Sequence, residues 1–211
     1  RDRVGTSFSA PKVSYIASAI QKVLPNASAL LYRALIVQSA KLPGDTSRLS
    51  PDDKKMLMRQ MGYGIPNVNS ATKNNDYRVT LITPDSNDIS AGEAHIYSIN
   101  IPDALMSVGE DYNILLEITL SYSAKPRRTR CGIKGYMSTW LDWTCSRIGE
   151  AEDIFRKRVF ETDKSMQDDG SFSWAIRERN DWGDYKGFNR KGQTLQKDWC
   201  LLKSSQLSSA F

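Results

Sequence analysis

Residues 5–11 read Gly5-Thr6-Ser7-Phe8-Ser9-Ala10-Pro11, and an amphipathic helical pattern follows them directly. A serine at a glycine-preceded turn from a strand into a helix is where hydrolases place a nucleophile. The turn exposes Oγ, and the helix N-terminus adds free N–H groups and the positive end of the helix dipole. Ser is also the commonest residue at a helix N-cap, so Ser7 taken alone is better explained as a cap. A serine nucleophile also needs a base, and the chain has one histidine, His95.

The first third of the chain is predicted to be helical. Apolar residues recur at helical spacing after Ser7, with Pro11 in the first turn and Pro25 at the end of the helix. Further helices are predicted from about Ser28 to Ala40, from the N-cap Ser50 to Gly62, and in a short segment capped by Asn67.

From about Tyr77 the hydrophobic period changes to two, which is typical of strands. The clearest strand runs from Tyr112 to Tyr122, where the even-numbered apolar residues form one face and Leu115 is the exception on the other. Other strands are predicted over 77–83, 94–101 and 136–144, with further candidates at 171–177 and 199–202, and a surface helix over 150–160. Short alternating strands separated by turns favour an antiparallel β-sandwich.

The opening segment resembles the nucleophile motif of the subtilisin-like serine proteases (subtilases), Gly-Thr-Ser-x-Ser/Ala-x-Pro, which is matched by Gly5, Thr6, Ser7, Ser9 and Pro11. This resemblance reverses the preference for a cap at Ser7. It covers about residues 1–75 and implies the helical tail of a subtilase α/β catalytic domain there. Residues 76–211 are then expected to form an antiparallel, jelly-roll-like β-sandwich domain, so the fold class is α+β.

The resemblance also implies a mechanism. Ser7 would attack the scissile carbonyl of a polypeptide substrate, with Thr6 and Gly5 giving backbone support to the oxyanion. In the family the triad runs Asp, His, Ser along the chain, so both partners of Ser7 would lie in an upstream part of the same protease domain. His95 follows the catalytic-type region and is better explained as a half-exposed strand residue. We therefore expect these 211 residues alone to be inactive.

Charge and cysteine content limit the partners. The net charge is +5, and the one dense basic cluster, at 125–130, is better explained as a solvated loop than as a nucleic-acid site. No apolar run is long enough to suggest a membrane span. Cys131, Cys145 and Cys200 are odd in number and lack CxxC spacing, which argues against zinc and favours a reducing compartment such as the cytoplasm over secretion, although one Cys131–Cys145 bridge stays open.

No cofactor is expected. Three pairs of aspartates lie in turn-rich segments, and none has the spacing of a calcium loop: Asp85 with Asp88, Asp168 with Asp169, and Asp181 with Asp184. Five tryptophans crowd the last third, and core packing explains them better than a ligand platform: Trp140, Trp143, Trp174, Trp182 and Trp199.

Two other functions fit the same sequence. The chain could be a non-catalytic binding module, in which the sandwich and the basic loop recognise a protein or nucleic-acid partner and Ser7 only caps a helix. Alternatively, the sandwich could have a purely structural role and brace the catalytic domain.

Overall fold

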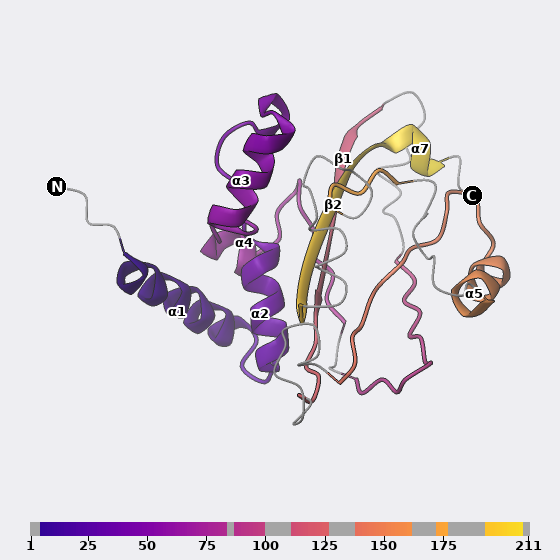
Figure 1. The fold of residues 1–211 in the computed structure, drawn as a ribbon, viewed down its shortest axis with the longest axis horizontal. Coiled ribbons are helices and arrows are strands. Elements are labelled where there is room, and N and C mark those ends of the chain that lie inside the picture. Colours follow the sequence, from indigo (N-terminus) through magenta and orange to yellow (C-terminus); the bar gives the residue numbers. More distant parts are fainter. Residues whose placement is uncertain are drawn as a thin grey trace.

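A computed structural model describes residues 5–83, 87–99, 111–126, 138–161, 172–176 and 193–208. The described elements are helices α1 (Thr6–Val23), α2 (Ala29–Gln38), α3 (Pro51–Met61), α4 (Val68–Thr72), α5 (Glu152–Glu161) and α7 (Ser204–Ser208), a 3₁₀ turn η1 (Thr46–Arg48), and strands β1 (Asn113–Ser121) and β2 (Leu195–Lys203). Figure 1 shows the helices of the first third on one side of the strand pair. The fold is α+β.

The helix boundaries follow local signals. Ser28 accepts a hydrogen bond from Leu31 N at the start of α2, and Ser50 accepts one from Asp53 N at the start of α3. Asn67 caps α4 in the same way. Because each cap satisfies an N–H group within its own helix, short sequence windows are sufficient to find it. The predicted second, third and fourth helices are confirmed.

The two strands form an antiparallel ladder, in which Asn113 pairs with Lys203 at one end and Ser121 pairs with Leu195 at the other. One face of β1 carries Leu116 and Ile118 toward a core built around Trp174, Cys200 and Leu202. Leu115 lies on the other face and is exposed, as the alternation predicts. The strand predicted at 112–122 is therefore confirmed, and the short candidate at 199–202 is part of a longer strand.

Several other predicted strands are wrong. Alternation predicted strands over 77–83, 94–101, 136–144 and 171–177. Their described parts, residues 77–83, 94–99, 138–144 and 172–176, contain no strand, and the remaining residues lie outside the described ranges. The described residues hold one two-stranded sheet, so a β-sandwich is not shown. Alternation indicates which side chains can face a core, but it does not supply a neighbouring strand to accept the backbone hydrogen bonds.

Three apolar clusters join segments that are distant in sequence. Ile16 and Ile20 of α1 pack with Leu35 of α2 and Ala71 of α4. Met58 of α3 packs with Ala175 and Ile176, next to Trp199 of β2. The third cluster surrounds Trp174, whose ring meets that of Trp143 edge-on at 4.8 Å. Packing contacts therefore cross from the first 75 residues to the last third of the chain.

Gly64 lies where two backbone segments cross. Lys41 and Ile65 exchange backbone hydrogen bonds of 3.1 and 2.9 Å and so form an isolated bridge. Gly64, with φ of 100°, would place a Cβ 2.2 Å from the carbonyl oxygen of Lys41. Only glycine has both the conformation and the space that this crossing requires.

We expect Gly64→Ala to destabilise the chain by about 2–5 kcal/mol, because strain at positive φ adds to a backbone clash. Gly92→Ala is the matched control: its φ of 83° is also positive, but a Cβ there meets nothing within 4 Å. Urea unfolding measures both. Equal losses of unfolding free energy in the two variants would contradict the role assigned to the crossing.

Cys200 is buried in the third cluster, and its environment opposes ionisation. Desolvation, helped by the nearby Cys145 thiol and Asp198 carboxylate, raises the pKa of the Cys200 thiol to about 12. Above pH 9 the unfolded chain loses this proton while the folded chain retains it. Stability contributed by the thiol is therefore complete below pH 9 and is lost as the pH rises toward 12.

The prediction is that Cys200→Ala flattens the alkaline decline in unfolding free energy by up to about 1.4 kcal/mol per pH unit. Urea unfolding with a reductant at pH 7, 9, 10 and 11 provides the test, and the comparison uses slopes because the cavity left by alanine lowers stability at every pH. If parent and variant decline in parallel above pH 9, the thiol does not titrate as described.

Candidate functional site

Ser7 is the second residue of α1 and lies on the surface of the described chain. The N-cap position of α1 is occupied by Gly5, and no side chain accepts a capping hydrogen bond there, so Ser7 is not the cap. The Ser7 hydroxyl makes no hydrogen bond to another described residue. The interpretation of Ser7 as a helix cap is therefore wrong, and its Oγ is open to solvent in the described part of the chain.

The backbone around Ser7 has the polarity that an oxyanion requires. Thr6 and Ser7 are the first two helical residues, and N–H groups in a first turn have no acceptor within their helix. The first turn contains no acidic residue, so no carboxylate within it competes for the positive end of the helix dipole. An 18-residue helix thus presents its N-terminus beside a serine hydroxyl.

The fold does not constrain Gly5, and the expected place of Pro11 in the first turn needs correction. Gly5 has φ of 165°, an extended conformation open to any residue, and a Cβ there would meet the Phe8 ring at 3.8 Å, an ordinary contact. Nothing in the described structure therefore requires glycine at this position. Pro11 lies inside α1 beyond its first turn, so it cannot donate the usual backbone hydrogen bond to the Ser7 carbonyl four residues earlier.

The first half of α1 is uncovered. Figure 1 shows this half extending away from the strand pair. All residues from 5 to 15 are exposed, among them Phe8 at 48%, Val13 and Tyr15. Burial begins at Ile16, where α2 and α4 pack on the helix.

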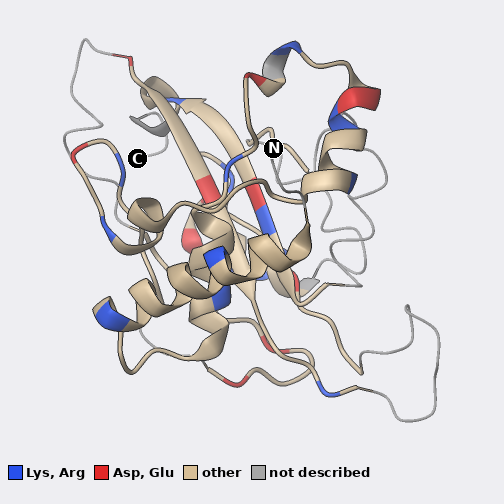
Figure 2. Cartoon of the chain, turned by 90° about the vertical axis from the view of Figure 1, so that its left-hand side faces the viewer, with Lys and Arg blue, Asp and Glu red and all other residues tan. Residues whose placement is uncertain are grey.

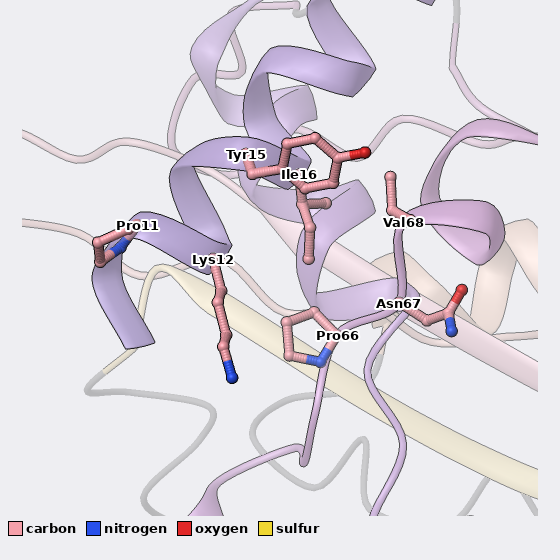
Figure 3. A pocket seen from close by; sticks show the side chains of 7 residues that line it. All are labelled: Pro11, Lys12, Tyr15, Ile16, Pro66, Asn67 and Val68. Atoms are coloured by element: carbon pink, nitrogen blue, oxygen red, sulfur yellow. The ribbon is translucent and has the colours of Figure 1, made fainter. Parts of the chain in front are cut away.

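A wide-open pocket of about 450 Å³ lies one helical turn from Ser7, at the boundary between the exposed and the packed half of α1. Pro11 lies four residues after Ser7 and hence on the same helix face. Figure 3 shows α1 residues along one side of the pocket and the turn before α4 on the other. The lining residues are Pro11, Lys12, Tyr15, Ile16, Pro66, Asn67 and Val68. Sequence reasoning missed this pocket because its two sides are about 50 residues apart.

The described structure offers Ser7 no base. His95 is exposed and lies in an irregular segment, where the centroid of its ring is 6.5 Å from that of the Tyr97 ring. It is not a strand residue, and no interaction links it to Ser7 in the ranges that the structure covers.

The described ranges also bear on a metal cluster and a membrane-spanning helix. No cluster of three or more His, Cys, Asp or Glu side chains suited to a metal ion occurs there. The helices of the same ranges include none that is long and apolar enough to cross a membrane. Cys200 is a free thiol. Several residues singled out in the sequence lie outside the described residues: Cys131, Trp182, most of the basic cluster and five of the six paired aspartates.

Comparison with known proteins relates the chain to an uncharacterized relative and its residues 3–64 to a peptidase family. The uncharacterized protein y4bN of Sinorhizobium fredii (strain NBRC 101917 / NGR234) is 35% identical over 159 residues, which is 74% of this chain and 35% of the relative. The chain thus spans about a third of that relative's length, and the similarity extends well past residue 64. No solved structure matches. Residues 3–64, which include Ser7 and helices α1 to α3, match the subtilase family of peptidases.

Proposed function

We propose that the chain is the nucleophile-bearing portion of a subtilisin-like serine endopeptidase. The match of residues 3–64 to the subtilase family supports this proposal, and the position of Ser7 carries it: an exposed hydroxyl in the first turn of a long helix, in the motif Gly5 to Pro11. In this proposal residues 1–75 belong to the catalytic domain, and residues 76–211 form an accessory region.

In the proposed reaction, Ser7 Oγ attacks the carbonyl carbon of a peptide bond. A histidine from an upstream part of the protease domain takes the hydroxyl proton and passes it to the leaving amine, and an aspartate orients that histidine. The negative charge that develops on the carbonyl oxygen is stabilised by N–H groups at the start of α1, with Thr6 and Gly5 supporting that backbone. Water then hydrolyses the acyl-enzyme and restores Ser7.

The same proposal assigns no activity to these 211 residues alone. Without a base, the hydroxyl keeps its proton at neutral pH and is a poor nucleophile. Purified chain is expected to give no turnover of a fluorogenic peptide library above the rate of Ser7→Ala. Turnover that requires Ser7 would overturn this part of the proposal.

A fluorophosphonate probe tests the nucleophile directly. The chain supplied with the upstream half of the protease domain should be labelled at Ser7, with the adduct located by mass spectrometry of the peptide that contains residues 5–11. Labelling should be lost in Ser7→Ala and retained in Ser9→Ala, whose hydroxyl lies on the same helix two residues later. Equal labelling of the parent and Ser7→Ala, or none in the parent, would reject Ser7 as the nucleophile.

A further inference from the structure

Lys197 is a charged residue in the interior of the protein. It lies on β2, in the part of the chain that does not match the subtilase family, and its side chain is 2% exposed. Its Nζ donates to the carbonyl oxygen of Gln38 at 2.9 Å and to that of Ala40 at 2.8 Å. It also lies 3.0 Å from Oε1 of Glu117 on β1, whose side chain is 15% exposed. An ammonium has three N–H donors, and here three acceptors surround it.

The acceptors belong to α2, to the segment that follows it and to β1. Gln38 is the last residue of α2, so Lys197 places a positive charge against the negative end of that helix. The Gln38 side chain reaches the sheet as well: its Nε2 donates to Glu117 Oε2 at 3.4 Å, and its Oε1 accepts from the Thr119 hydroxyl. Figure 2 shows charges of both signs on the strand pair. We call Gln38, Ala40, Glu117, Thr119 and Lys197 the α2–sheet cluster.

This arrangement is costly unless it is complete. Burial lowers the pKa of Lys197, and the nearby Lys41 lowers it further, while the Glu117 carboxylate opposes both effects. Removing one partner leaves a desolvated charge or an unpaired carbonyl group, whereas replacing the ion pair by apolar residues can be neutral. The cluster therefore has a geometric role that apolar packing would not reproduce, because the ammonium bonds to two carbonyls at the end of α2, one on each side of Ser39.

The segment held by Lys197 is linked through α4 to the helix that carries Ser7. Ser39, between the two bonded carbonyls, accepts a hydrogen bond from Asn67 N at 3.2 Å. Asn67 caps α4, whose Ala71 packs against Ile16 and Ile20 of α1. Lys41, the next residue after Ala40, forms the bridge to Ile65. Residues 38–41 thus connect the strand pair on one side to α4 and α1 on the other.

We propose that Lys197 is a positioning residue for the Ser7 helix, acting through the Gln38 and Ala40 carbonyls and the turn that leads to α4. The strand pair is then part of the same cooperative unit as the subtilase-like residues, rather than a separately folding module. The effect of Lys197 on the reaction of Ser7 rests on the proposed function. The effect of Lys197 on the position of α4 and α1 does not.

Hydrogen exchange of the 211-residue chain tests the structural link. Lys197→Met is expected to speed amide exchange at least tenfold in the last turn of α2, in α4 and in the packed half of α1, and to leave α5 unchanged. Lys203→Met is the matched control, because Lys203 lies on the same strand but is half exposed and pairs with Asp111 at the surface. Unchanged exchange in α1 and α4 of Lys197→Met would overturn the proposal.

A second variant separates positioning from global stability. Lys197→Met combined with Glu117→Leu removes both charges and should recover much of the lost stability in urea. If Lys197 is a positioning residue, α4 and α1 still exchange faster than in the parent at matched stability, because the two carbonyls still lack their donor. Full recovery of α1 protection would show that Lys197 acts through stability alone. If Lys197→Met does not fold, the double variant is compared with Glu117→Gln, in which Lys197 keeps its contacts to the two carbonyls. Parental exchange in α1 of the double variant then rejects the proposal.

The fluorophosphonate reaction gives the functional readout. With the upstream half supplied, the double variant is expected to label at Ser7 at least fivefold more slowly than the parent, and Lys203→Met at the parental rate. Parental labelling of the double variant contradicts the positioning role. Absence of labelling in the parent rejects the proposed function instead, and the exchange result stands independently.

Discussion

The structure depends on one buried ammonium. Lys197 joins both strands to the end of α2, and the residues it holds also anchor the turn before α4. A desolvated charge tolerates little displacement, since each lost partner costs far more than a lost apolar contact. The apolar clusters supply most of the burial, but they are distributed in three separate groups. The α2–sheet cluster determines how the helical and strand regions are aligned.

Sequence reasoning succeeded where the determining interactions are local. The caps at Ser28, Ser50 and Asn67 each act within three residues, and all three helices begin where these residues predicted. It failed where pairing is distant. Whether an alternating segment becomes a strand depends on a partner: β1 has one in β2, about 80 residues away, while residues 77–83 show the same alternation and form no ladder.

The most informative residues of the core gave no signal in the sequence. Gln196, Lys197 and Asp198 are three consecutive polar residues, and all three are buried. A run of this kind is typical of a surface loop. Their partners come from segments near residues 40, 117, 141 and 176, which no short window contains. At the candidate site, a seven-residue motif was sufficient to single out Ser7. The pocket one turn away could be found only from the folded arrangement of α1 and the turn before α4.

Pro11 gives the Ser7 turn a degree of mechanical independence. Most helical turns are tied to the next by a full set of backbone hydrogen bonds and therefore move with it. Here one of those bonds cannot form, between the turn that carries Ser7 and the turn that follows. The first turn can thus adjust its tilt without unwinding the packed half of α1, which remains held by Ile16 and Ile20. The missing bond thus falls between the exposed turn that carries Ser7 and the half of α1 that packs on α2 and α4.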